Sequence, residues 1–248
     1  MNSFKKFLQR IGLYALELCW PRNCPVCGRS GDRENRHICS ACFAKLEWIE
    51  SGSCCKICET PIATHVDHEF VCSSCVASKP HYDFLRSSLI YSYPIDYVIQ
   101  MFKYEGSVFF TEELSEILEG TVKAKFPYEE IDLIIPVPLH KNRILKRGYN
   151  QSELLATALS HRLNRAVDTV SFIRKADTPQ QARLSHEERS ENVKGAFKVV
   201  RPEYIRARTI LLIDDVTTSG ATLNECAKVL KQAGASKVWC LTLAKVRD

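Results

Sequence analysis

The sequence predicts an α/β protein in which a mostly parallel sheet, flanked by helices, follows a small cysteine-rich module. Apolar segments of strand length alternate with segments of helix length over residues 81–248, which is typical of parallel strands joined by helical crossovers. Residues 21–80 are instead rich in cysteine and loop-forming residues. Apolar residues at helical spacing near the N-terminus predict an amphipathic helix over residues 1–20.

The composition of the 248 residues is that of an ordinary globular protein. A hydrophobic content of 45% and a charged content of 25% argue against a disordered chain and against a membrane protein. Charged residues interrupt the N-terminal helix, so it differs from a secretory signal. We expect it to pack on its own domain, with a membrane-surface or partner helix as the less favoured alternative. The expected location is cytoplasmic, without a transmembrane segment.

Capping and turn residues set the boundaries of the expected elements. Asn150 can cap the start of a helix, and Gly234 can end one. Residues 175–194 are polar and contain a Thr-Pro turn, so we expect a mobile loop there. The expected helices cover residues 95–104, 112–126, 150–164 and 221–233. The expected strands cover residues 84–91, 131–135, 167–174, 195–200, 209–213 and 237–243.

Eight of the twelve cysteines form four Cys-x-x-Cys pairs. Two such turns complete a tetrahedral site of four thiolates, which is typical of structural zinc and leaves no open position for catalysis. Without a secretory signal, paired cysteines favour metal over disulfides. We expect two zinc ions, with consecutive pairs combined as the simplest arrangement and cross-braced pairs as the alternative. The expected ligands are Cys24, Cys27, Cys39, Cys42, Cys55, Cys58, Cys72 and Cys75.

The charge distribution favours a polyanionic ligand. The formal net charge is +5, which two zinc ions on eight thiolates would lower to about +1. Residues 140–208 hold fifteen lysines and arginines against seven acidic residues, a local excess of +8. Such a stretch suits a diphosphate or a nucleic acid, and charge alone does not choose between them.

Residues 210–222 combine an apolar strand, an acidic pair, a hydroxyl-rich turn and the start of a helix. The turn brings backbone N–H groups and a helix N-terminus to one point, which favours phosphate binding. Asp214 and Asp215 would repel a bare phosphate, but they suit a ligand that also carries sugar hydroxyl groups or Mg²⁺. The expected binding residues of the turn are Val216, Thr217, Thr218, Ser219, Gly220, Ala221 and Thr222.

The string Asp-Asp-Val-Thr-Thr-Ser-Gly-Ala-Thr at residues 214–222 resembles the phosphoribosyl diphosphate motif of the type I phosphoribosyltransferases. This resemblance implies a type I phosphoribosyltransferase-like domain over residues 81–248. It also implies that Asp214 and Asp215, as the catalytic pair, contact the ribose hydroxyl groups. Residues 217–222 would hold the 5′-phosphate of phosphoribosyl diphosphate, which would bind together with Mg²⁺.

Further motifs narrow the resemblance. The cysteine pairs, residues 134–139, residues 147–151 and residues 178–197 together resemble the ComF family of competence-associated proteins over essentially the whole chain. The departures are Tyr149, where phenylalanine is more frequent, and the additional Cys54. The family implies a role in natural transformation or DNA utilisation. Its implied partners are single-stranded DNA and the DNA-uptake machinery, such as a competence helicase, which could hold the protein at the inner membrane.

The loop after residue 135 is expected to hold the diphosphate. Its basic candidates are Arg143, Lys146 and Arg147, because guanidinium groups suit phosphate, and a solvated surface is the equal alternative. Residues 175–193 would close over the reaction and exclude water. Lys103 is expected on a solvated helix face. Five tyrosines are expected in the core rather than as stacking platforms for bases: Tyr82, Tyr91, Tyr93, Tyr97 and Tyr104.

Three functions fit these observations. The first is a phosphoribosyltransferase with an unknown acceptor, which would act through an oxocarbenium-like transition state as in glycoside hydrolysis. The second is a DNA-uptake factor whose pocket binds nucleotide or single-stranded DNA without chemistry. The third is a regulator that senses phosphoribosyl diphosphate. Diphosphate release across candidate acceptors would distinguish the first from the others.

Overall fold

The computed structural model describes residues 23–29, 36–50, 52, 54–61, 70–178 and 191–247. The chain forms two compact units, residues 1–46 and residues 47–248. The expected helix over residues 1–20 lies outside the described residues, and the expected boundaries after residues 20 and 80 stay predictions. None of the helices in the described ranges is long and apolar enough to cross a membrane.

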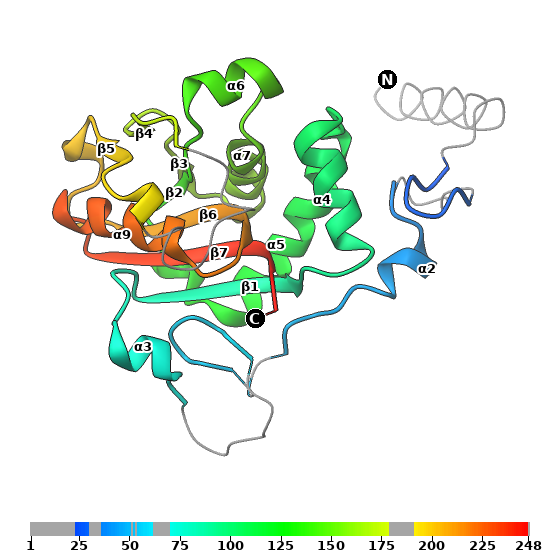
Figure 1. The fold of residues 1–248 in the computed structure, drawn as a ribbon, viewed down its shortest axis with the longest axis horizontal. Helices are drawn as coiled ribbons and strands as arrows, with labels where there is room; N and C mark the ends of the chain where they lie inside the picture. The colour runs from blue at the N-terminus through cyan, green and yellow to red at the C-terminus, as the bar shows by residue number, and fades with distance from the viewer. Residues whose placement is uncertain are drawn as a thin grey trace, which may run out of the picture. The chain divides into compact units, whose positions relative to one another are not determined.

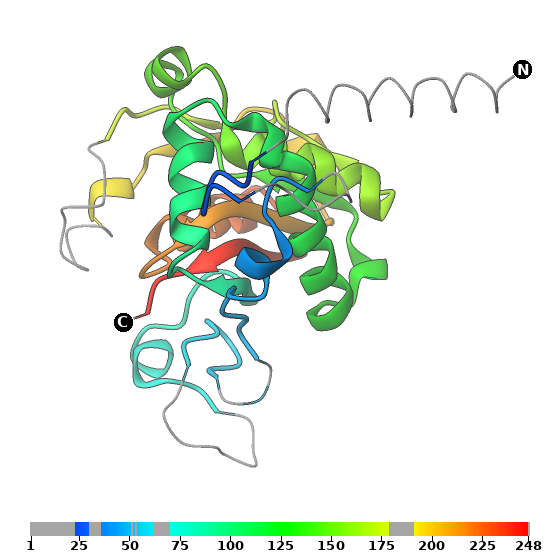
Figure 2. The same ribbon diagram turned by 90° about the vertical axis from the view of Figure 1, so that its right-hand side faces the viewer.

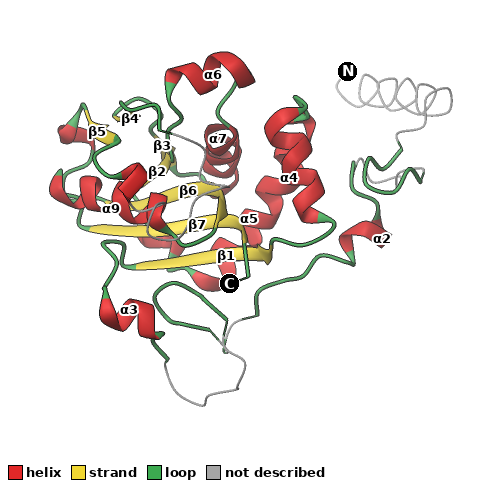
Figure 3. Cartoon of the chain, in the orientation of Figure 1, coloured by secondary structure: helices red, strands yellow, loops and turns green. Residues whose placement is uncertain are grey.

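The larger unit contains a five-stranded sheet in the order β1-β7-β6-β2-β3 (Figure 1). All neighbouring strands in this sheet are parallel, which confirms the predicted fold class. Helices flank the strands (Figure 3). The strands are β1 (Phe84–Ile90), β2 (Leu133–Pro136), β3 (Ala166–Val167), β6 (Thr209–Thr217) and β7 (Lys237–Lys245).

Side chains from alternate strand positions pack on opposite faces of the sheet. Leu133 and Ile135 of β2, together with Ile210 and Leu212 of β6, join a core cluster with the buried side chains of α9. Helices α5 and α7 pack against each other and against the strands, while α9 packs on β6, β7 and β5. Figures 1 and 2 show the sheet between these helices. The helices are α4 (Ile95–Tyr104), α5 (Thr111–Lys125), α7 (Gln151–Leu163) and α9 (Ala221–Gln232).

The expected strand over residues 167–174 is wrong, because two separate strands occupy this segment. β3 ends at Val167, and β4 (Phe172–Arg174) pairs antiparallel with β5 (Phe197–Val199) in a second sheet. The chain turns at Asp168, whose carboxylate accepts hydrogen bonds from the backbone N–H groups of Val170 and Ser171, both at 2.8 Å. An aspartate side chain that binds the backbone two residues ahead is a local turn signal, and it ends β3 here.

The structure contains a helix that the sequence did not predict. α6 (Lys141–Arg147) occupies the segment expected to be the diphosphate loop. The ring nitrogen of His140 accepts from Asn142 N at its start, and Gly148 ends it in the left-handed region at φ +90°, where glycine pays no steric penalty. The remaining helical segments are α2 (Ser40–Phe43), α3 (Ser73–Ala77), and the 3₁₀ turns Val108–Phe110, Tyr128–Glu130 and Pro202–Tyr204.

Candidate functional site

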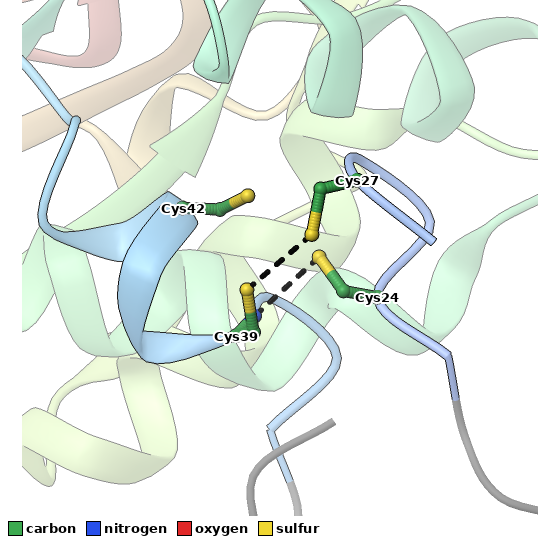
Figure 4. A group of neighbouring side chains, drawn as sticks. All are labelled: Cys24, Cys27, Cys39 and Cys42. Atoms are coloured by element: carbon green, nitrogen blue, oxygen red, sulfur yellow. Dashed lines mark hydrogen bonds between the residues drawn. The ribbon is translucent and has the colours of Figure 1, made fainter. Parts of the chain in front are cut away.

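The first four-cysteine group lies in the smaller unit. Its four sulfur atoms lie within 4.8 Å of one another and face a common centre (Figure 4). The Sγ atoms of Cys27 and Cys39 are 3.6 Å apart, close to the roughly 3.8 Å that Zn–S bonds of about 2.3 Å give in a tetrahedron. The backbone N–H of Cys39 also points at Cys24 Sγ over 3.5 Å. The group is Cys24, Cys27, Cys39 and Cys42.

The second group lies in the larger unit and has the same construction. Cys58 Sγ and Cys72 Sγ are 3.7 Å apart, and Cys72 N donates to Cys55 Sγ over 3.3 Å. Burial opposes ionisation of Cys55, but backbone N–H groups outweigh it and lower its pKa to about 7, which suits a thiolate ligand. Consecutive pairs are thus combined in both groups, and both fit structural zinc. Cys54 is not part of the second group, which is Cys55, Cys58, Cys72 and Cys75.

Hydrogen bonds tie the second group to the parallel sheet. Leu85 N at the start of β1 donates to Ile57 O over 2.7 Å, so the first cysteine turn continues the edge of the sheet. Lys245 Nζ of β7 donates to Cys58 O over 3.4 Å. Glu59, buried directly after this turn, forms an ion pair of 2.7 Å with Lys125 of α5. The second metal site is therefore built into the larger unit.

The acidic pair lies near the end of β6. Asp214 Oδ1 accepts from Ser152 Oγ at the start of α7 over 2.9 Å. Asp215 Oδ1 forms an ion pair with Lys103 Nζ of α4 over 2.9 Å and accepts from Val216 N over 2.6 Å. Asp215 Oδ2 is buried and has no hydrogen-bond partner in the structure. An unpaired buried carboxylate oxygen is costly, and its position at a cavity suits a ligand that donates to it.

Burial and mutual repulsion set the charge state of this cluster. Burial and the neighbouring Asp215 raise the pKa of Asp214 to about 7, although Lys103 and Ser152 oppose the shift. Burial also works against the charge on Lys103, but the attraction and hydrogen bond of Asp215 outweigh it, so the pKa of Lys103 is raised. One lysine therefore faces two carboxylates, and the cluster can accept a further cation.

The predicted phosphate loop connects β6 with α9. Gly220 is the N-terminal cap residue of α9 at φ +76°, and no side chain caps this helix. An uncapped N-terminus presents backbone N–H groups and the positive end of the helix dipole. Ser219 Oγ is buried without a hydrogen-bond partner. The loop thus supplies donors at the point where the sequence predicts a phosphate group.

The acidic pair lines a cavity with a volume of about 210 Å³, and basic side chains line it as well. Of the three predicted basic residues, Arg143 and Arg147 line it, and exposed Lys146 does not. Arg174, at the end of β4, also lines it. Burial and the nearby charge of Arg143 lower the pKa of Arg174, as expected where two cations face a space for an anion. The acidic members of the lining are Asp214 and Asp215.

Comparison with known proteins identifies the family. The chain is 32% identical over 227 residues to competence protein F of Haemophilus influenzae, covering 86% of this chain and 94% of that protein. The chain belongs to the ComF family. It is also 31% identical to DNA utilization protein YhgH of Escherichia coli K12, covering 90% and 96%. Competence protein ComFC of Bacillus subtilis is 25% identical, with 86% of both chains covered.

Two domain families account for the two kinds of site in this ComF protein. A double zinc ribbon domain matches residues 15–76, and a phosphoribosyl transferase domain matches residues 144–248. Among solved structures, the chain resembles glutamine phosphoribosylpyrophosphate amidotransferase of B. subtilis, with 14% identity and a TM-score of 0.40, covering 58% of this chain and 30% of that chain. A purine phosphoribosyltransferase of Pyrococcus horikoshii gives a TM-score of 0.34 with 14% identity, covering 54% and 82%.

Several interpretations of individual ComF residues need correction. Lys103 does not lie on a solvated face, because its side chain is 18% exposed and paired with Asp215. Tyr93, Tyr97 and Tyr104 are not core residues: they are 54%, 43% and 58% exposed. Arg174 was not predicted, although a basic residue that ends a strand was a usable signal. Residues 179–190, which include most of the expected closing loop, lie outside the described residues.

Proposed function

We propose that this ComF protein binds phosphoribosyl diphosphate with Mg²⁺ in the cavity at the end of β6, and that its two cysteine groups hold structural zinc. The observation that carries the proposal is the acidic pair with an unpartnered oxygen, placed directly before an uncapped helix N-terminus. A sugar phosphate has hydroxyl groups that can donate to the acidic pair and an anionic phosphate that can accept from the helix N-terminus. The ribose hydroxyls would donate to Asp214 and Asp215, and residues 217–222 would surround the 5′-phosphate.

The arginines of the cavity suit the diphosphate end of the same ligand. Arg143 donates to Thr178 O, and Arg147 donates to Gln151 Oε1, so both guanidinium groups are already oriented. Their planar forks match phosphate oxygen atoms. Mg²⁺, when bound, would neutralise charge on the diphosphate as it leaves ribose C1. Lys103 forms an ion pair with Asp215. Its positive charge would balance the acidic pair before the ligand binds.

A calorimetric titration with phosphoribosyl diphosphate and Mg²⁺ tests the binding. We expect the wild-type protein to bind and the double variant Asp214→Asn, Asp215→Asn to lose at least about 2.7 kcal/mol, or a hundredfold in affinity. The matched control is Glu129→Gln with Glu130→Gln, an acidic pair on an exposed 3₁₀ turn. Equal affinity in all three proteins would contradict the assignment.

Metal analysis should find about two zinc ions per chain.

Binding and chemistry need separate measurements. If the protein transfers the phosphoribosyl group, diphosphate should appear when candidate acceptors are added to the loaded protein, and the Asp214→Asn, Asp215→Asn variant should release none. Binding without release across purine, pyrimidine and amine acceptors would instead identify a protein that senses phosphoribosyl diphosphate. The cysteine groups take no chemical part in this step, since four thiolates leave zinc no open position.

Single-stranded DNA is a second candidate ligand, and exposed aromatic side chains favour it. Tyr97 and Tyr104 lie on α4, and the guanidinium of Arg147 lies 5.0 Å from the ring centre of Tyr104. Exposed rings next to basic groups bind bases by stacking and the backbone by charge. This role agrees with a cytoplasmic protein that meets incoming DNA through uptake machinery, such as a competence helicase, at the inner membrane.

Fluorescence anisotropy with a labelled oligonucleotide tests this candidate. We expect weak binding without sequence preference that falls as salt rises, because counterion release drives it. Tyr97→Ala with Tyr104→Ala should weaken it by roughly 1–3 kcal/mol per lost stacking contact, whereas Tyr128→Ala serves as a control away from α4. Competition by phosphoribosyl diphosphate would show that the two ligands overlap at Arg147. No binding at low salt would leave a partner protein as the DNA contact.

A further inference from the structure

The segment between the second cysteine group and β1 contacts the predicted phosphate loop. Tyr82 in this segment is 4% exposed. Its hydroxyl lies 3.4 Å from the position that a Cβ on Gly220 would take, and Thr217 Oγ1 lies 4.0 Å from the same position. Gly220 is the residue from which α9 begins. The phenol therefore fills the space directly against the turn in which the 5′-phosphate is proposed to lie.

Hydrogen bonds fix both neighbours of Tyr82. His81 N donates to Asn224 Oδ1 in the first turn of α9 over 2.7 Å. Asp83 N donates to Val238 O over 2.8 Å, and Val238 N donates to Asp83 Oδ2 over 2.6 Å. The segment is thus attached to α9 on one side of the tyrosine and to β7 on the other. Movement of this segment would be transmitted to the start of α9.

The second cysteine group packs against the core that contains Tyr82. Ile57, between Cys55 and Cys58, packs against the core cluster that contains Tyr82. Leu85, three residues after Tyr82, is hydrogen-bonded to Ile57 O. The metal-binding turn therefore packs on the core that contains Tyr82, and Tyr82 lies against the phosphate loop.

We propose that Tyr82 is a positioning residue that couples the second zinc site to the phosphate loop, so that binding of a sugar 5-phosphate depends on zinc in the second group and not in the first. The inference rests on the proposed function of residues 217–222. Zinc supplies the folding energy of such cysteine turns. When the second ion is lost, the turn around Ile57 loosens, Tyr82 loses its support, and the N–H groups of the loop lose their common orientation.

Variants of Tyr82 test the contact while both cysteine groups stay intact. The probes are ribose 5-phosphate, which engages the loop, and inorganic diphosphate with Mg²⁺, which engages the arginines. We expect Tyr82→Leu to weaken ribose 5-phosphate about tenfold and Tyr82→Phe, which keeps the ring, only about twofold. Diphosphate affinity should be unchanged in both. Wild-type ribose 5-phosphate affinity in Tyr82→Leu, or an equal loss of both probes, would overturn the proposal.

A matched pair of cysteine variants tests the dependence on zinc. Cys39 and Cys72 are equivalent, since each precedes a short helix and each directs its backbone N–H at a sulfur of its own group. Cys39→Ser and Cys72→Ser should each lower the zinc content by about one ion per chain. Only Cys72→Ser should weaken ribose 5-phosphate, again about tenfold. Equal affinities in the two variants would overturn the proposal.

Hydrogen exchange separates this coupling from the proposed function. Without any ligand, the amides of residues 217–222 should exchange about tenfold faster in Tyr82→Leu and in Cys72→Ser than in wild type, and at the wild-type rate in Cys39→Ser. If the wild type binds no ribose 5-phosphate but both variants still exchange faster than it does, the proposed ligand is refuted and the coupling is retained. Unchanged exchange in Tyr82→Leu refutes the coupling, even if Cys72→Ser fails to fold.

Discussion

Two lysine–carboxylate pairs in the larger unit differ in how completely their polar atoms are satisfied. Glu59 Oε1 binds Lys125 Nζ at 2.7 Å, Glu59 Oε2 accepts from Ser87 N, and Lys125 Nζ also donates to Ile49 O and Ser87 O. The pair of Lys103 and Asp215 leaves Asp215 Oδ2 without a partner and has a second carboxylate beside it.

The difference separates a structural ion pair from one suited to a ligand. Every oxygen of Glu59 has a donor, so the pair next to the second cysteine group can only hold elements together. The pair at the end of β6 has one lysine for two carboxylates and opens on a cavity. Buried polar atoms are normally paired, and two of the atoms that break this rule, Asp215 Oδ2 and Ser219 Oγ, lie where the ligand is proposed to bind.

Removal of the lysine from the closed pair should have the largest effect on stability. Lys125→Met leaves the carboxylate of Glu59 buried without a countercharge, and breaking such a pair costs about 3–5 kcal/mol. Urea unfolding measures the loss. Lys123→Gln is the control, because the Lys123 side chain is 54% exposed and pairs of exposed lysines contribute less than about 1 kcal/mol. Equal losses in the two variants would remove the distinction between closed and exposed pairs.

The corresponding change in the open pair should cost less stability and more binding. Lys103→Met should destabilise the protein by only about 2 kcal/mol, less than a closed pair, because the acidic pair opens on a cavity from which it can take up a cation. Mg²⁺ should restore part of the lost stability in this variant and none in Lys125→Met. Thermal unfolding with and without Mg²⁺ measures both. A loss as large as that of Lys125→Met, with no response to Mg²⁺, would contradict an open site.

The raised pKa of Asp214 predicts a pH-dependent gain of stability on its removal. Asp214 binds its proton more tightly in the folded protein, so it lowers stability as pH rises from about 4 to about 7. Asp214→Asn should therefore be more stable than wild type at pH 8, by at most about 4 kcal/mol for a shift of this size, and the gain should vanish near pH 4. Unfolding curves of the variant and the wild type between pH 4 and pH 8 measure this gain in stability. A gain independent of pH would exclude ionisation as its cause.

The smallest change in stability is expected at Ser219. Its buried hydroxyl has no partner, so Ser219→Ala removes an unsatisfied group and should change stability by no more than about 0.5 kcal/mol. The affinity for ribose 5-phosphate should nevertheless fall about fivefold, because a donor to the phosphate is lost. Ser171→Ala, distant in sequence but also buried, is the control for affinity. A large loss of stability in Ser219→Ala would assign the hydroxyl to folding.

Local sequence signals predicted most elements of the larger unit. The helix over residues 95–104 was predicted at its observed bounds, since Ile95, Val98, Ile99 and Phe102 form its buried face. The same periodicity misplaced Lys103, which follows Phe102 at the end of that face and pairs with a residue far along the chain. Helical spacing shows which side of a helix is apolar, but it does not show which distant carboxylate lies beside its last turn.

The misassigned strand has a similar explanation. Residues 167–174 are mostly β-branched or aromatic, and the turn signal at Asp168 was missed, so one strand was predicted where β3 pairs with β2 and β4 with β5. Because β4 is separate from β3, its last residue, Arg174, lies in the lining of the cavity. The two cysteine groups, in contrast, were predicted residue by residue, because ligand spacing within each pair is a local property. What the sequence could not indicate is that the second group belongs to the larger unit, which depends on contacts of Ile57 and Glu59.

The length of β6 has a consequence for ligand affinity. The strand was expected to end at Ile213, but it continues to Thr217, with Asp214 paired to Thr242 and Val216 to Ala244 of β7. The backbone of both acidic residues is therefore ordered before any ligand is present. Ordering an interface side chain on association costs about 0.5–1.5 kcal/mol, and folding has already removed much of this freedom. A sugar would therefore bind to a rigid pair of acceptors. The conformational entropy lost on binding would come mainly from the sugar and not from the protein.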